Sequence, residues 1–168
     1  MNYYVVETDK HKLIQKTAGV KARQDVETIF KWNNLKKIEI PCLIEGRENK
    51  TRLGKIKAHY DVYMLWKNAL KKIKKNDWIY IQFPLLEHTM LFSLLIKNLE
   101  KRGIHTSIII HDVEAIRFTL RNDVPLSRKI RMRFEEISSF KNCSKIIVHN
   151  EKMKSFMHEK WKIHKDKM

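Results

Sequence analysis

The feature that most constrains the fold is an alternation between short apolar runs and longer segments with helical periodicity. The apolar runs have the length of β-strands and occupy residues 3–6, 37–44, 77–84, 104–110 and 145–148. Between them, apolar residues recur every three or four positions, as on one face of an α-helix. Strands that are apolar throughout and alternate with helices are typical of a parallel sheet covered on both faces. The sequence therefore predicts a doubly wound, Rossmann-like α/β domain.

Three of the predicted helices carry apolar side chains that we expect to face the sheet. The spacing of each set places its members on one side of the helix. The sets are Leu53, Ile56, Tyr60, Tyr63, Trp66, Leu70 and Ile73; Leu91, Leu94, Leu95 and Leu99; and Ile130, Phe134 and Ile137. Gly103 follows the second of these helices and is expected at its C′ position.

The length of the chain indicates a single domain. It has 168 residues, enough for one well-developed core, and 43% of them are hydrophobic while 32% are charged. This is a globular balance. We predict one Rossmann-like domain over residues 1–160 and a frayed tail over residues 161–168.

The chain is strongly basic, because 35 Lys and Arg residues outnumber 19 Asp and Glu residues and leave a net charge of +16. Such a charge favours phosphates, nucleic acid or an anionic membrane surface. The segment 127–134, "SRKIRMRF", keeps a basic nucleic-acid-binding module open as the alternative function. No recognition motif accompanies the charge, so nucleic acid is the less favoured partner.

The sequence carries no signal peptide and no apolar stretch near the roughly 18 residues that a membrane span requires. We therefore expect a cytoplasmic protein and leave peripheral contact with the inner face of the membrane open. Cys42 and Cys143 lack metal-ligand or redox spacing. Dinucleotide, P-loop and Asp-x-Asp motifs are also missing from the sequence, so we expect neither a metal ion nor a resident cofactor.

Polar residues directly follow three of the predicted strands. They are Gln82, the pair His111 and Asp112, and the pair His149 and Asn150. Parallel sheets bind ligands outside the carboxyl ends of their strands, where these residues would converge. The sequence therefore predicts a ligand site at this edge of the sheet.

The segment after residue 111 has two interpretations. Asp112 could cap a helical turn while Glu114 and Arg117 form an ordinary ion pair. The same carboxylates could instead bind a sugar hydroxyl and act as a general base. Both interpretations remain open.

A loop precedes the first predicted helix and contains Thr17 and Gly19, with Lys21 just beyond. Backbone N–H groups at a helix N-terminus favour anions, so this loop could approach a phosphate. A glycine in a loop is also compatible with a simple turn.

Four segments together resemble a known family. They are "TAGVKARQDVETIF", "IYIQFPL", "IIIHDVEAIR" and "SKIIVHNEKMKSFM", and they span residues 17–157 in this order. They resemble the amino-terminal half of a group of bacterial GT-B glycosyltransferases. The group includes galactofuranosyltransferases of polysaccharide synthesis and glucosyltransferases that extend glycans on serine-rich adhesins.

The resemblance implies transfer of a sugar from a nucleotide sugar to a hydroxyl of a glycan or glycoprotein, without a metal ion. In the GT-B fold two Rossmann-like domains face one cleft, and this chain matches the acceptor side. The donor domain would lie outside it, so we expect little or no activity from the chain alone.

The resemblance also implies roles for individual residues. His111 and Asp112 would form the catalytic centre. The acceptor side would consist of Gln82, Glu114, Arg117, His149, Asn150 and Met153. Thr17, Gly19 and Lys21 would face the donor across the cleft.

A homo-oligomer is a further hypothesis. Apolar residues near the carboxyl end could mediate self-association, although a helix facing the core explains them equally well. They are Met153, Phe156, Met157 and Trp161.

Overall fold

The computed structural model describes residues 1–8, 18–43, 51–87, 89–119 and 121–168, without the side chains of residues 18, 114, 118 and 119. Its centre is a five-stranded sheet with the order β2-β1-β3-β4-β5, in which every neighbouring pair is parallel. The strands are β1 (Asn2–Thr8), β2 (Lys36–Pro41), β3 (Trp78–Phe83), β4 (His105–Ile110) and β5 (Lys145–Ile147). The predicted α/β fold with a doubly wound parallel sheet is confirmed.

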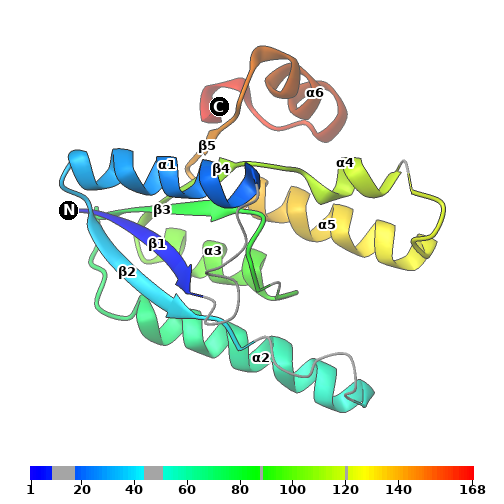
Figure 1. Cartoon of the computed structure of the whole chain (residues 1–168), viewed down its shortest axis with the longest axis horizontal. Helices are drawn as coiled ribbons and strands as arrows, with labels where there is room; N and C mark the ends of the chain where they lie inside the picture. Colours follow the sequence, from blue (N-terminus) through cyan, green and yellow to red (C-terminus); the bar gives the residue numbers. More distant parts are fainter. Residues whose placement is uncertain (9–17, 44–50, 88, 120) are drawn as a thin grey trace.

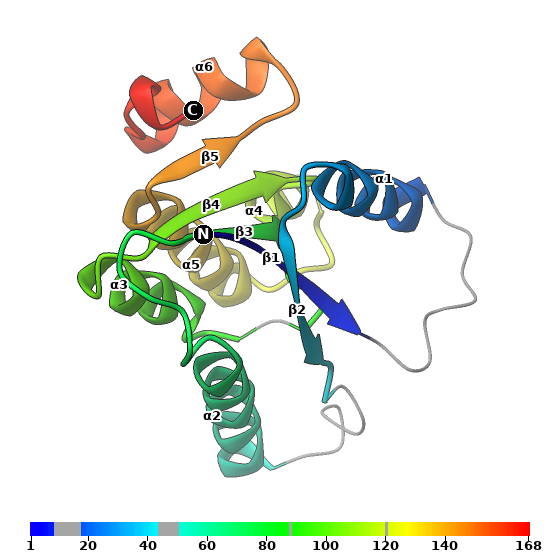
Figure 2. The same ribbon diagram turned by 90° about the vertical axis from the view of Figure 1, so that its left-hand side faces the viewer.

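Helices cover both faces of this sheet, as Figures 1 and 2 show. They are α1 (Ala18–Trp32), α2 (Arg52–Ala69), α3 (Phe92–Lys101), α4 (Glu114–Thr119), α5 (Leu126–Asn142) and α6 (Glu151–Trp161), followed by a 3₁₀ turn at Lys165–Lys167. The chain winds outward from β1 to β2 in one direction and from β3 to β5 in the other. Right-handed crossovers therefore place α1 on one face and α2, α3 and α5 on the opposite face.

Alternate strand residues build two separate cores. On the α1 side, Phe30 contacts Tyr4 and Tyr80, with ring centroids 5.2 and 5.3 Å apart. The opposite face holds the larger core, in which Trp66 of α2 and Phe140 of α5 are buried. Both faces of β3 and β4 are thus covered, which explains why these strands are apolar throughout.

Local signals account for several helix ends. Thr51 Oγ1 accepts a hydrogen bond from the Gly54 N–H at the start of α2, and Asn150 Oδ1 accepts one from the Met153 N–H at the start of α6. Gly103 adopts φ 73° directly beyond α3, and a Cβ there would lie 2.8 Å from Lys75 Cγ. The predicted C′ glycine is confirmed, since only glycine adopts this conformation without strain.

The predicted apolar stripes are buried only in part. Tyr63, Trp66, Leu70 and Ile73 are buried as expected, but Leu53, Ile56, Tyr60, Leu94, Ile130 and Phe134 are exposed. Figure 1 shows the reason for α2, because its amino-terminal half continues past the carboxyl ends of the strands and has no sheet beneath it. In α5, Ile130 and Phe134 lie on the side of the helix away from the buried Met132, so the predicted inward face of this helix is wrong.

The carboxyl-terminal residues are packed and not frayed. Ile163 is buried, and Lys167 Nζ donates to the carbonyls of Lys141 and Cys143 at 2.6 and 2.8 Å. Lys162 takes a left-handed conformation (φ 56°) that turns the chain back after α6. Burial of Ile163 holds this segment against the domain.

Among the described residues, none of the helices has the length and apolar composition of a membrane-spanning segment.

Candidate functional site

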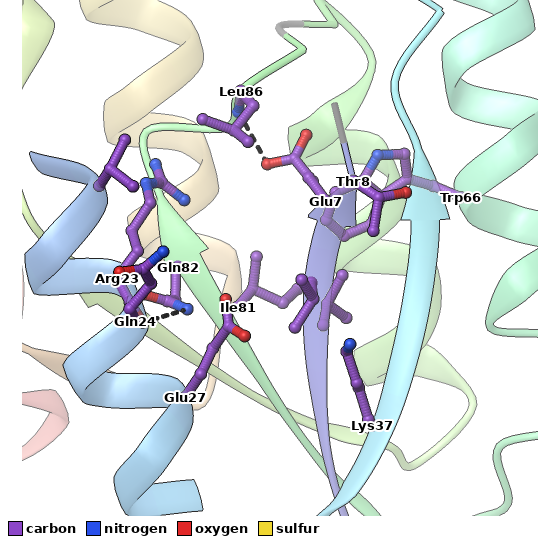
Figure 3. A pocket seen from close by; sticks show the side chains of 13 residues that line it. Glu7, Thr8, Arg23, Gln24, Glu27, Lys37, Trp66, Ile81, Gln82 and Leu86 are labelled. Atoms are coloured by element: carbon purple, nitrogen blue, oxygen red, sulfur yellow. Dashed lines mark hydrogen bonds between the residues drawn. The ribbon is translucent and has the colours of Figure 1, made fainter. Parts of the chain in front are cut away.

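The carboxyl edge of the sheet contains a cavity of about 250 Å³ between α1 and the ends of β1 and β3 (Figure 3). This is the point where the winding of the sheet reverses, and open α/β sheets bind ligands there. Its polar lining consists of Glu7, Thr8, Arg23, Gln24, Glu27, Lys37 and Gln82. The remaining lining side chains are apolar.

Glu7 lies near the end of β1 and is held by the loop after β3. Its Oε2 accepts a hydrogen bond from the Leu86 N–H at 2.7 Å, and its Oε1 accepts one from the Glu87 N–H at 3.1 Å. Burial raises the pKa of Glu7 to about 7, against the opposing effects of these backbone bonds and of Arg23. A carboxyl group with this pKa exchanges its proton near neutral pH and can either donate to or accept from a hydroxyl.

Arg23 and Glu27 lie one turn apart on α1 and face the cavity from the side opposite Glu7 (Figure 3). The Arg23 guanidinium donates to the Pro84 carbonyl, and burial lowers its pKa. Lys37 of β2 approaches the cavity from below Glu7. The cavity therefore combines carboxylates and cations and does not carry an excess of one sign.

His111 adjoins the cavity through Gln82. The His111 Nε2 atom lies 2.7 Å from Gln82 Oε1, while Gln82 Nε2 lies 3.5 Å from the Arg23 carbonyl and donates to it. His149 follows β5, and its Nε2 lies 3.2 Å from the His111 carbonyl. The structure thus brings together Gln82, His111 and His149 from three strand ends, as the sequence predicted.

The protonation of His111 follows from these contacts. Burial lowers its pKa to about 4, with smaller contributions from the charges of Arg23 and His149. The ring is neutral at physiological pH, and because Gln82 presents its oxygen, Nε2 carries the proton. Nδ1 is then a hydrogen-bond acceptor, and it is buried with no partner among the described residues.

Asp112 and Arg117 form an ion pair at the start of α4. Arg117 Nη2 lies 2.5 Å from Asp112 Oδ2, and Asp112 Oδ1 accepts a hydrogen bond from the Val113 N–H at 2.7 Å. Both side chains are about half exposed, at 45% and 52%. The sequence had suggested Glu114 as a partner of Arg117; the side chain of Glu114 lies outside the described residues.

Other predicted site residues have structural explanations or lie away from the cavity. Asn150 caps α6, and Met153 packs against the core. Gly19 lies in the first turn of α1, where an added Cβ would meet nothing within 4 Å, and Lys21 is exposed. Thr17 lies outside the described residues. Arg23, one helical turn after Gly19, faces the cavity instead.

Of the polar residues that line the cavity, only Gln82 was predicted from the sequence; Glu7 and Arg23 show why the others were missed. Glu7 follows the apolar run 3–6. The rule that selected Gln82 and His111 from the ends of their strands could have selected it too. Arg23 has no comparable signal, because the direction of a helical side chain depends on how the helix packs.

The described residues include no group of three or more His, Cys, Asp or Glu side chains placed to hold a metal ion. The polar groups at this edge are arranged for hydrogen bonds and ion pairs.

Comparison with known families gives a match that covers nearly the whole chain. A family described as "Glucosyltransferase 3-like, N-terminal domain" matches residues 2–167. A search among curated proteins found no match. The family description concerns glucosyltransferases and does not bear on galactofuranosyl transfer.

Proposed function

The chain belongs to the glucosyltransferase 3-like N-terminal domain family, and from this premise we propose that it is the acceptor-binding half of a glycosyltransferase. The complete enzyme would transfer a sugar from a nucleotide sugar to a hydroxyl of a glycan or glycoprotein. The observation that carries this proposal is the cavity of about 250 Å³ at the carboxyl edge. Its volume suits a single sugar ring better than a whole nucleotide sugar.

The balance of charge in the cavity favours a sugar over a diphosphate. Glu7 and Glu27 offset Arg23 and Lys37, and Gln82 adds a neutral amide. Sugar hydroxyls both donate and accept hydrogen bonds, so a mixed lining of this kind suits them. A diphosphate is bound best where cations and helix N-termini dominate.

His111 and Gln82 would orient the acceptor. Gln82 lines the cavity and accepts the Nε2 proton of His111, so His111 would hold the amide that meets the acceptor hydroxyl. The low pKa of His111 makes it a weak base, so it would position Gln82 and not deprotonate the acceptor.

Two carboxylates are candidates for the general base. Asp112 lies beside His111 in sequence and pairs with Arg117. Glu7 lines the cavity, and its pKa of about 7 suits proton acceptance at neutral pH. In the complete transferase, Asp112→Asn and Glu7→Gln distinguish them, because the variant that removes the base should reduce kcat at least about a hundredfold.

The donor sugar nucleotide would bind mainly to a second domain. We therefore expect the 168-residue chain to bind an acceptor and to show little or no transferase activity by itself.

The test is a nuclear magnetic resonance titration of the isotopically labelled chain. One arm uses serine-linked monosaccharide glycopeptides and the other uses UDP-glucose. We expect the glycopeptides to shift the amide signals around Glu7, Gln82 and His111, and UDP-glucose to shift them far less at equal concentration. A stronger response to UDP-glucose at these residues would assign the cavity to the donor and refute the proposal.

A further inference from the structure

The amino-terminal half of α5 displays an apolar stripe to solvent. Leu126, Ile130 and Phe134 are spaced four residues apart and are 72%, 61% and 72% exposed. They lie on the side of the helix opposite Met132 and Ser139, which are buried. Residues four apart in a helix lie on one face, so the three side chains form a continuous line.

Cations flank this stripe within the same helical turns. They are Lys129, Arg131 and Arg133. Arg131 Nε also lies 3.6 Å from Glu135 Oε1, whereas Arg128 lies on the side of Met132. The first acids of α5 are Glu135 and Glu136, and they turn inward, because the Glu135 side chain is 13% exposed and Glu136 is 2% exposed. The outward surface of this half of the helix thus combines large apolar side chains with positive charge.

We propose that the amino-terminal half of α5 binds an anionic lipid bilayer surface. A helix with an apolar face and flanking Lys and Arg residues lies in the membrane interface, where its apolar side chains enter the acyl region and its cations meet lipid phosphates. The inference does not depend on the proposed function. Figure 1 shows this half of α5 beyond the strand ends, where the sheet does not cover it.

Charge argues against two other occupants of the stripe. A second copy of the chain docked through this stripe would bring Lys129, Arg131 and Arg133 against their own counterparts. A nucleic acid would satisfy the cations, but its phosphate backbone gives no apolar environment to Leu126, Ile130 and Phe134. Lipid is the partner that satisfies both halves of the pattern.

The test measures co-sedimentation of the full 168-residue chain with vesicles. One set contains phosphatidylcholine mixed with phosphatidylglycerol, and the other contains phosphatidylcholine alone. At physiological ionic strength we expect binding to the mixed vesicles and little to the neutral ones. Ile130→Ser combined with Phe134→Ser should lower the partition coefficient by about tenfold or more. Lys129→Gln combined with Arg133→Gln should lower it by about tenfold.

The control variant removes equally exposed apolar side chains from the other face of the sheet. Ile29 and Trp32 of α1 are 51% and 77% exposed, so Ile29→Ser combined with Trp32→Ser matches the α5 variant in kind. We expect this control to bind vesicles within about twofold of the unmodified chain. Circular dichroism shows whether each variant is folded.

Three outcomes would overturn the proposal. The first is no binding of the unmodified chain to anionic vesicles, and the second is equal binding by the α5 serine variant, which would indicate attraction by net charge alone. In the third, the Ile130→Ser and Phe134→Ser variant still binds vesicles but has lost another interaction. That interaction would be self-association, measured by sedimentation velocity, or nucleic-acid binding, measured by titration with duplex DNA.

Discussion

At the level of single residues, Glu7 and His111 respond to pH in opposite directions although both lie at the carboxyl edge of the sheet. Burial raises the pKa of Glu7 to about 7 and lowers that of His111 to about 4. In both cases the folded protein favours the neutral form. Burial therefore disfavours charge at these two positions, which is compatible with binding of a neutral sugar.

Glu7 should make the fold less stable as pH rises. The pKa of Glu7 is about 7 in the folded protein and 4.5 in the unfolded chain. Its contribution to the stability of the fold is therefore complete below pH 4.5 and is lost as pH rises through 7. At pH 8 the cost reaches at most about 3 kcal/mol. Glu7→Gln removes this cost, and urea denaturation should show the variant gaining stability relative to the unmodified chain between pH 5 and pH 8. A stability difference that does not change with pH would contradict the assigned pKa.

His111 should make the fold less stable as pH falls. Its pKa falls from 6.5 to about 4 on folding, so its contribution is complete above pH 6.5 and lost as pH falls through 4. Nitrogen-15 spectra at pH 5.5 should show a neutral ring with the proton on Nε2. Gln82→Ala should weaken this tautomer preference. An imidazolium signal at pH 5.5, or a proton on Nδ1, would refute the proposed orientation of His111.

At the level of elements, one carboxylate joins α3 to two strands. Glu100 Oε1 accepts hydrogen bonds from Thr106 N–H and Oγ1 at 2.8 and 2.5 Å, and from Ser144 N–H and Oγ, both at 2.9 Å. Thr106 belongs to β4, and Ser144 directly precedes β5. Glu100 therefore fixes the amino ends of these strands, on whose opposite ends His111 and His149 lie.

Removal of Glu100 should destabilise the whole domain. Glu100→Ala leaves the buried donors of Thr106 without this acceptor, and the expected loss is about 2 kcal/mol or more of unfolding free energy. Lys97→Ala, an exposed change in the same helix, should alter the free energy by less than about 0.5 kcal/mol. Equal effects in a urea titration would show that the hydrogen bonds of Glu100 contribute little.

The elements also show which features a sequence reveals. The apolar runs predict the strands because β3 and β4 are covered on both faces, and the strand ends predict Gln82, His111 and His149. Helical periodicity identified the buried face of α2 in its carboxyl-terminal half, but it cannot show whether a strand lies beneath each turn. In α5 it predicted the wrong face, because the helix buries Met132 and turns Ile130 and Phe134 to solvent. The inward direction of Arg23 depends on packing in the same way.

At the level of the whole molecule, the strand order β2-β1-β3-β4-β5 determines where the site lies. The chain leaves β1 and β3 in opposite directions, and the gap between their ends becomes the cavity that Glu7, Arg23 and Gln82 line. The family match over residues 2–167 covers this whole unit. Under the two proposals, the cavity at the carboxyl edge would bind the acceptor, and the amino-terminal half of α5 would contact a lipid surface.

The most direct test of the acceptor proposal compares the histidines at the two ends of β4. His111 follows the carboxyl end of β4, whereas His105 begins it and stacks on Trp78 with ring centroids 4.9 Å apart. Isothermal titration with a serine-linked glycopeptide should show His111→Ala raising Kd by about tenfold and His105→Ala changing it by less than about twofold. Unchanged affinity in His111→Ala, or an equal loss in both variants, would contradict acceptor binding at the carboxyl edge.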